Sequence, residues 1–151
     1  MIRSVWLAIA VSVLPVAAFA GEDLHIGHGW MAATDETTVR VFLEIENEGS
    51  EAVTLIGARS DVAGATAIAG PPLKANSSAL VVLPEYPIAP GAELHMEPDG
   101  LYLLLTDAKG PFKEGTEFDM VLTFAPGGDI EVHVDVEGPN AESESHEGHN
   151  H

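Results

Sequence analysis

Three histidines lie within the last six residues of this chain. Of the side chains present, histidine is the one best suited to bind a transition metal. The segment His146-Glu147-Gly148-His149-Asn150-His151 interleaves imidazoles with a carboxylate and small polar residues. Imidazole nitrogen suits copper, zinc and nickel, and a flexible segment can wrap around whichever ion arrives. A solvated polar terminus or a purification tag is the alternative, although a tag is usually an uninterrupted histidine run. The pattern predicts a natural metal-binding tail and leaves the metal open.

A second pair of histidines, His25 and His28, lies close to Met31 near the other end of the chain. Imidazole accepts copper in either oxidation state and thioether selects Cu(I), so this trio suggests a copper site. In an extended strand the two imidazoles would point to opposite faces, so a bend at Gly27 or Gly29 would be needed to bring them together. Two ordinary surface histidines are the alternative interpretation.

The two remaining histidines, His95 and His133, lie in stretches with strand patterning. Neighbouring strand residues face opposite sides, so at most one of His95 and Met96 can join a shared site, and we expect Met96 in the core. His133 shares its face with Glu131 and Asp135, which predicts a solvated side chain rather than a ligand. The metal-binding candidates are therefore His25, His28, His95, His146, His149 and His151.

Catalysis finds no support in the sequence. The absence of cysteine excludes a disulfide framework, a thiolate nucleophile and a cysteine-containing blue-copper centre. No nucleophile elbow, H-E-x-x-H helix or P-loop occurs, and carboxylate pairs carry little information among 24 acidic residues. We therefore expect no catalytic residue and no enzyme activity. Without a cysteine or a haem motif, electron transfer is disfavoured as well.

The first twenty residues have the arrangement of a secretory signal peptide. Arg3 supplies a positive charge, an apolar run from Val5 to Phe19 follows, and Ala18-Phe19-Ala20 forms an A-x-A cleavage site. A membrane anchor needs about 20 apolar residues, and Pro15 interrupts this shorter run. We expect cleavage after residue 20 and a soluble periplasmic protein, with no lipid anchor because no cysteine follows and no membrane insertion after cleavage.

The charge of the chain is strongly negative, at −18, and removal of Arg3 would take it to −19. Such a field repels nucleic acid and anionic membrane surfaces and attracts cations. Solubility alone also explains an excess of acidic residues. We expect no nucleic-acid partner, and metal cations are the partners that this field would favour.

Between residues 24 and 138 the sequence carries the pattern of many short β-strands. From Val39 to Glu46 apolar residues alternate with a second set that includes Arg40, Phe42 and Glu44, and the segment 47–50 then turns, which is period-two patterning closed by turn residues. Glycine and proline punctuate the stretches between such runs, and no window sustains a capped helical period. The pattern predicts an antiparallel sandwich or Greek-key barrel. Further strands are expected over 53–56, 79–83, 101–105, 118–124 and 130–136. In one of them Met120 alternates with Phe118, Leu122 and Phe124, which predicts that Met120 lies in the core.

The composition changes at Gly138, after which Ala141 is the only apolar residue. A segment of Pro, Asn, Ser, Glu and His cannot bury enough surface to fold by itself, which predicts a disordered tail. The expected organisation is a signal peptide over 1–20, one β domain over 21–138 and a disordered His-rich tail over 139–151.

Five local motifs occur in a fixed order along this domain: Trp30 after a short strand, Val41-Phe42-Leu43-Glu44-Ile45-Glu46-Asn47-Glu48-Gly49, Leu55-Ile56-Gly57-Ala58-Arg59-Ser60, Ile88-Ala89-Pro90-Gly91, and Met96-Glu97-Pro98-Asp99-Gly100-Leu101-Tyr102-Leu103-Leu104-Leu105. With them, the chain from His28 to Val136 resembles the periplasmic PCu(A)C copper-chaperone family. The resemblance implies an all-β, cupredoxin-like antiparallel β-sandwich that delivers Cu(I) to the copper centres of respiratory oxidases.

The resemblance also implies a Cu(I) site of two histidines and two methionines, and this sequence departs from it at every position. None of the four residues found there is a plausible Cu(I) ligand. Copper binding is then expected to have moved to nitrogen-rich positions, which favour Cu(II) over Cu(I) because the thioethers are lost. A metal-free scaffold that binds a partner protein is the other account. In the family's register the four positions are Ala69, Leu80, Tyr102 and Leu104.

The expected function is that of a periplasmic copper-binding protein with Cu(II) or Cu(I) as its ligand. It would carry copper to a copper-requiring membrane or periplasmic enzyme, or to another copper chaperone. A metal-free interaction module, and zinc or nickel buffering by the tail, are the alternatives. The positions of His25, His28 and His95 in the folded domain bear on this choice.

Overall fold

The structure, a computed structural model, describes residues 23–144 of the chain. The expected signal peptide and the tail histidines His146, His149 and His151 therefore lie outside the described residues. Within residues 23–144 no helix is long and apolar enough to span a membrane.

Short strands make up most of the described chain, as the period-two pattern predicts. The elements in order are β1 (Leu24–Ile26), β2 (Gly29–Ala32), β3 (Val39–Val41), β4 (Glu44–Asn47), β5 (Val53–Arg59), β6 (Ala65–Gly70), β7 (Val81–Leu83), β8 (Tyr86–Ile88), β9 (Glu93–His95), β10 (Tyr102–Thr106), β11 (Glu117–Ala125), β12 (Gly128–Glu137) and α1 (Ala141–Glu144).

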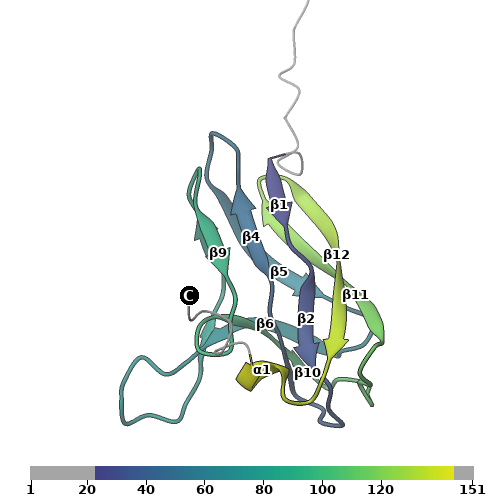
Figure 1. The fold of residues 1–151 in the computed structure, drawn as a ribbon. Helices are drawn as coiled ribbons and strands as arrows, with labels where there is room; N and C mark the ends of the chain where they lie inside the picture. The colour runs from purple at the N-terminus through teal and green to yellow at the C-terminus, as the bar shows by residue number, and fades with distance from the viewer. Residues whose placement is uncertain (1–22, 145–151) are drawn as a thin grey trace, which may run out of the picture.

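The strands form three sheets that pack over a shared core (Figure 1). One sheet has the order β2-β12-β11-β5-β8, and the other two have the orders β1-β4-β9 and β3-β10-β6-β7. Neighbouring strands are antiparallel except for β2, which runs parallel to β12. The predicted all-β sandwich is confirmed, with this one parallel pair as a departure from purely antiparallel pairing.

Alternation along β12 shows how the sequence produces the sandwich. Val132, Val134 and Val136 are buried in the core cluster, while most residues between them face outward. Met120 and Leu122 of the neighbouring β11 alternate in the same way and join the same cluster. Because successive strand residues face opposite sides, each second residue adds to the core. Burying such a side chain contributes about 1.5–3 kcal/mol.

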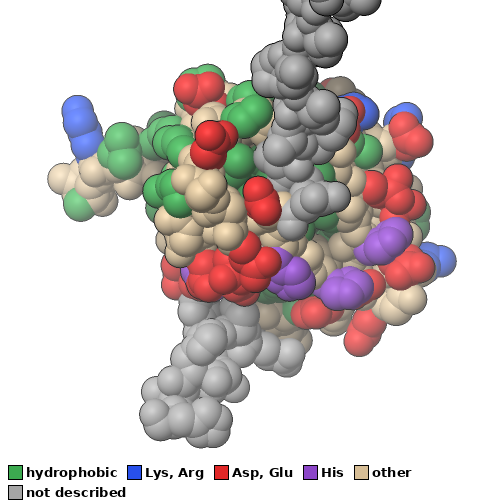
Figure 2. Space-filling model, turned by 90° about the horizontal axis from the view of Figure 1, so that it is seen from above, with side chains coloured by type: hydrophobic (Ala, Val, Ile, Leu, Met, Phe, Trp, Pro, Cys, Tyr) green, Lys and Arg blue, Asp and Glu red, His purple; other side chains and the backbone are tan. Residues whose placement is uncertain are grey.

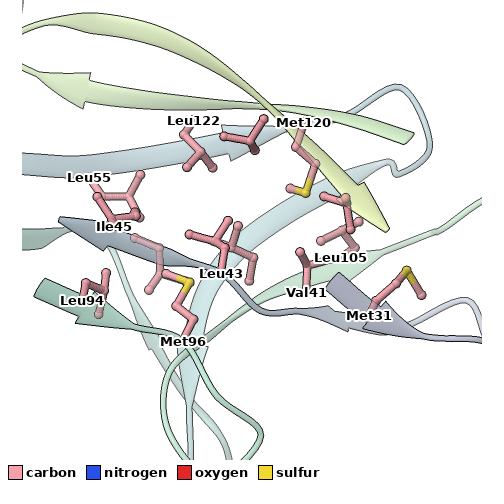
Figure 3. Close-up of a cluster of buried hydrophobic side chains, with 14 of the residues drawn as sticks. Met31, Val41, Leu43, Ile45, Leu55, Leu94, Met96, Leu105, Met120 and Leu122 are labelled. Carbon is pink, nitrogen blue, oxygen red and sulfur yellow. The ribbon is translucent and has the colours of Figure 1, made fainter. Parts of the chain in front are cut away.

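The methionines of the described chain all lie in this core (Figure 3). Met31, Met96 and Met120 are each at most 3% exposed. The predicted core positions of Met96 and Met120 are confirmed. Met31 is buried as well, so its thioether does not join the exposed imidazoles of His25 and His28 at a surface site.

Phe42 is buried although it alternates with the core residues Val41 and Leu43. The long strand expected from Val39 onward is divided into β3 and β4, and Phe42 lies at the break with no exposed surface. Each of Trp30 and Phe42 donates its backbone N–H to the carbonyl oxygen of the other at 2.9 Å. The ring of Trp30 lies 4.6 Å from that of Phe42 and covers it. A neighbouring strand, not the period of its own strand, therefore buries Phe42.

Asn47 is a buried polar residue at the end of β4, in the segment predicted to turn. Its side-chain amide donates to the carbonyl oxygens of Glu51 at 2.8 Å and Ile88 at 3.0 Å, and its Oδ1 accepts from the N–H of Gly49 at 3.0 Å. These bonds satisfy the buried amide and attach the turn to β8.

The described part of the expected disordered tail is ordered against the domain. Residues 141–144 form α1, a single helical turn in which Ala141 is buried. Glu142 pairs with the guanidinium of Arg40, which also donates to the carbonyl oxygen of Pro98 at 3.1 Å. One apolar residue and one ion pair thus hold the segment in place. In Figure 1, α1 lies at the end of the sandwich opposite β1.

Candidate metal site

His25 and His28 flank the point where the chain leaves one sheet for another. His25 lies opposite Glu46 in the β1–β4 pair, and the N–H of Gly27 donates to the carbonyl oxygen of Glu44 at 2.9 Å. Beyond this bond the chain crosses over, and β2 begins at Gly29 beside β12. The crossing is the kind of bend that an approach of the two imidazoles requires.

A groove of about 350 Å³ lies beside this crossing. Three of the residues lining it are histidines, His25, His28 and His133, and Glu131 is its carboxylate. Figure 2 views this end of the molecule and shows histidines in a row among aspartates and glutamates. The complete lining is Leu24, His25, Ile26, Gly27, His28, Ile130, Glu131, Val132 and His133.

His133 forms a compact cluster with two carboxylates on the outer face of the five-stranded sheet. It lies directly across from Asp119 in the β11–β12 register, and its Nδ1 is 2.5 Å from Oδ1 of Asp119. One potential ligand atom from each of Asp119, Glu131 and His133 lies within 4.8 Å of the others. The hydrogen bond to Asp119, together with its negative charge, raises the pKa of His133 above its ordinary value.

Gly29 permits the close approach of β2 to β12 that brings His28 to this cluster. A Cβ atom at position 29 would lie 2.9 Å from Cγ2 of Val134 and 3.3 Å from the carbonyl oxygen of His133. Any side chain there would push the two strands apart. With glycine in place, Nδ1 of His28 lies 4.0 Å from Oδ2 of Asp135 on β12.

His95 belongs to a separate cluster on the β1-β4-β9 sheet. Its Nε2 lies 2.8 Å from Oε2 of Glu93, and its Nδ1 lies 3.6 Å from Oε2 of Glu44, its partner across the strands. These three residues can also bring ligand atoms within 4.8 Å of one another. Because β4 separates β9 from β1, the backbones carrying His95 and His25 are roughly 10 Å apart.

The sequence candidates are therefore divided in space. His25 and His28 line one groove, while His95 lies in another cluster with its own carboxylates. His133, which the sequence assigned to a solvated face, is indeed exposed but also lines the groove. The available signal was its position among acidic residues on one strand face. That pattern is equally typical of a solvated surface, and only the placement of residues 24–28 beside β12 distinguishes the two interpretations.

Three of the four positions at which the family resemblance would place copper ligands lie in apolar surroundings. Ala69 and Tyr102 face each other in the β6–β10 pair and are buried with Phe42, and Trp30 and Leu104 pack against them. The rings of Phe42 and Tyr102 are 6.3 Å apart and edge to face. Aromatic and aliphatic groups therefore surround these three positions. The fourth position, Leu80, lies just before β7 and is 43% exposed.

A protein cation already lies over this aromatic cluster. The guanidinium carbon of Arg40 is 5.5 Å from the ring centroid of Phe42 and 5.2 Å from that of Tyr102. Such stacking places positive charge on the negative ring faces. The positive guanidinium would repel a metal ion at this cluster, whereas the groove offers imidazoles and a carboxylate as ligands.

Sequence comparison finds one family over most of the described chain. A family model described as "Putative lipoprotein LpqE-like" matches residues 24–136. A protein of Leifsonia xyli subsp. xyli named "Putative lipoprotein Lxx21020" is 23% identical over 128 residues, which cover 84% of this chain and 77% of that protein.

Structure comparison finds PCuAC domains. The apo domain from PmoF1 is 25% identical with a TM-score of 0.62, covering 78% of this chain and 95% of its own. The copper-bound domain from PmoF2 is 22% identical with a TM-score of 0.65, and the match covers 78% of this chain and 94% of that domain. The solution structure of CuI-DR1885 from Deinococcus radiodurans is 20% identical with a TM-score of 0.62, and the match covers 89% of this chain and 86% of that protein. The cupredoxin-like fold and the family resemblance expected from the sequence are confirmed.

Proposed function

The chain belongs to the LpqE-like lipoprotein family, and from this premise we propose that it is an exported protein that binds copper and passes it on. Two of the solved structures with this fold are described as holding copper, the PmoF2 domain and CuI-DR1885. The apolar segment before residue 20 and the negative charge of −18 support export and cation binding. We propose the periplasm as its location.

The observation that carries this proposal is that His25 and His28 line one groove. The family's ligand positions hold carbon-rich side chains, and the described methionines are buried, so copper has no thioether site here. Imidazole nitrogens and carboxylate oxygens are what this groove offers. Nitrogen and oxygen ligands suit Cu(II), which makes Cu(II) the proposed form.

His95 and the tail are proposed as further, weaker points of copper capture. His95 has a single imidazole between Glu44 and Glu93, all of them exposed. The tail histidines, His146, His149 and His151, follow α1 in the sequence and lie outside the described residues. Exposed ligands exchange readily with those of an acceptor, as delivery to a cuproenzyme or another chaperone requires.

A copper titration of the purified exported protein tests this proposal. Competition with chelators of known affinity should give roughly one to two Cu(II) per chain, with Cu(II) displacing Zn²⁺ and Ni²⁺. Replacing both His25 and His28 with alanine should weaken the tightest site, and the matched His95→Ala change should leave it in place. Failure of the intact protein to bind copper tightly would exclude the function. A preference for zinc or nickel would instead favour buffering of those metals.

A second candidate function, a metal-free interaction module, rests on a different surface. Leu73 is 89% exposed and Val82 is 56% exposed, on the connection between β6 and β7 and on the edge strand β7. Figure 1 shows this connection projecting from the body of the sandwich. A partner that binds equally well in the presence of a copper chelator, and is lost with Leu73→Ser, would favour this function.

A further inference from the structure

We infer that His133 is a third nitrogen ligand of the groove, which together with His25, His28 and Glu131 forms a three-imidazole, one-carboxylate site for Cu(II). This inference rests on the proposed function and assigns the ligand set of its main site. It adds two residues that the sequence had placed on a solvated face.

The strand register places two of the imidazoles side by side. Gly29 is the partner of Val134 in the parallel β2–β12 pair, so the residues before them, His28 and His133, occupy neighbouring positions. Adjacent strands lie about 4.8 Å apart, well within the reach of two imidazoles that share one ion. Gly29 and Val134 are both buried, so the residues that precede them are directed toward the outer face.

His25 reaches the same groove from the other sheet. Its strand, β1, pairs with β4, and the crossing at Gly27 brings the segment 24–28 alongside residues 130–133. The groove therefore receives imidazoles from two chain segments that are far apart in sequence. His25 lies in β1 and Glu131 and His133 lie in β12, while His28 directly precedes β2.

Asp119 selects which nitrogen of His133 is free to bind. An ionised carboxylate only accepts hydrogen bonds, so Nδ1 of His133 carries the proton in its 2.5 Å contact with Asp119. In the neutral ring Nε2 then keeps its lone pair, which is the arrangement that orients and strengthens histidine ligands in metal sites. Asp119 is on this account a positioning residue, and Glu131 supplies the oxygen ligand.

Two of the proposed ligands, Glu131 and His133, are already spaced for one ion. Ligand atoms on opposite sides of a metal, each about 2.1 Å from it, are about 4.2 Å apart. A ligand atom of Glu131 and one of His133 lie within 4.8 Å of each other, and the exposed side chains of His25 and His28, which line the same groove, must rotate toward them to complete the site. A tetragonal set of nitrogen and oxygen atoms is the geometry that Cu(II) prefers.

The cluster around His95 provides the matched comparison. It has the same spacing of ligand atoms and the same exposure, with two glutamates but one imidazole. It also lies outside the groove that the other three histidines line. If any exposed acidic cluster could hold the copper, the two clusters would behave alike.

The test uses Cu(II) alone and the full exported protein in which His146, His149 and His151 are replaced with alanine. Pulsed electron paramagnetic resonance should count three imidazole nitrogens at the tightest site. The variant His133→Ala should lower that count to two and weaken affinity more than the roughly 10–100-fold that loss of an outer partner costs. Asp119→Asn should weaken affinity by about 10-fold with the count unchanged, and His95→Ala should change neither.

Two results would overturn the inference, and they differ in what they say of copper binding. If His133→Ala keeps the nitrogen count and the affinity of its parent, His133 is not a ligand although the protein still binds copper. If the parent protein binds no copper, the ligand set fails, and if the intact protein with its tail histidines also binds none, the proposed function fails with it. Circular dichroism of each variant verifies that the exposed substitutions leave the fold intact.

Discussion

The aromatic cluster around Phe42 and the groove around His133 lie on the same sandwich and have opposite properties. The first is buried, carbon-rich and capped by the guanidinium of Arg40. The second is exposed, acidic and lined by three imidazoles. The aromatic cluster contains Ala69, Tyr102 and Leu104, three of the positions at which the family resemblance would place copper ligands, while the groove is the proposed copper site of this chain. The cluster is part of the packing of the fold, whereas the histidines of the groove are exposed.

The comparison teaches that stability and metal binding are carried by different residues in this protein. Removal of a buried ring leaves a cavity, whereas removal of an exposed imidazole leaves only solvent. Substitutions in the aromatic cluster should therefore change the free energy of unfolding, and substitutions in the groove should change copper affinity. Four measurements test how strict that separation is.

The largest effect is expected from Phe42→Ala. The ring is fully buried against Trp30 and Tyr102, so its removal should lower the free energy of unfolding by about 3–5 kcal/mol. Urea denaturation measures the change, and copper bound per folded chain should stay the same. Leu73→Ala, at a side chain 89% exposed, serves as the control and should cost less than about 0.5 kcal/mol. Copper loss from a folded Phe42→Ala protein would show that the two regions are coupled.

Gly29→Ala should affect both regions, because Gly29 lies between them. The added methyl would sit 2.9 Å from Cγ2 of the buried Val134, and overpacking of this kind costs about 1–3 kcal/mol. The same displacement moves His28 away from His133, so copper affinity should fall together with thermal stability. Gly57→Ala is the matched control, since a Cβ there has no atom within 4 Å. Equal losses of stability and copper affinity in Gly29→Ala and Gly57→Ala would show that the close approach of β2 to β12 is not the cause of those losses.

Arg40→Ala should have a smaller effect, on stability alone. It removes the cation over Phe42 and Tyr102 and the ion pair with Glu142, at about 1 kcal/mol for a partly exposed group. Differential scanning calorimetry measures the loss, and amide exchange should rise in α1. Arg40→Lys keeps the charge without the planar guanidinium, so its melting temperature should lie between those of the parent protein and Arg40→Ala. An unchanged melting temperature in Arg40→Ala would mean that the cation does not stabilise the cluster.

The smallest effect is expected for Arg59, which pairs with Asp129 on the exposed outer side of the five-stranded sheet. Hydrogen bonds from Arg59 and from Thr123 hold the pKa of the Asp129 carboxyl below its ordinary value of 3.8. A lowered pKa stabilises the folded state above pH 3.8, and this contribution disappears as the pH falls through the folded pKa.

Replacing Arg59 with alanine should therefore raise the pKa of Asp129, as carboxyl NMR titration would show. The stability difference from the parent protein should be small near neutral pH, because the pair is exposed, and should vanish in acid. Copper affinity should be unaffected, since neither residue lines the groove. A pKa for Asp129 that does not move would show that the ion pair is not formed in solution.

Several features of this protein could be predicted from residues near one another in sequence. Alternation from 117 to 137 correctly separated the buried valines of β12 from their outward-facing neighbours. The same alternation placed Met120 in the core, and the opposite directions of neighbouring strand residues placed Met96 there. Motifs in order predicted the sandwich, and the absence of His and Met at the family's positions was visible directly. These inferences succeed because side-chain direction within a strand depends on the local backbone alone.

Other features depend on which strands become neighbours, and only the tertiary structure decided them. Phe42 is buried because Trp30 of β2 covers it, and His133 gains its groove partners because β1 and β2 lie beside β12. His95, close to His25 in chemistry, is separated from it by β4. The sequence by itself determined the fold and the supply of imidazoles. The grouping of those imidazoles required long-range pairing between residues about a hundred positions apart, which a local period does not encode.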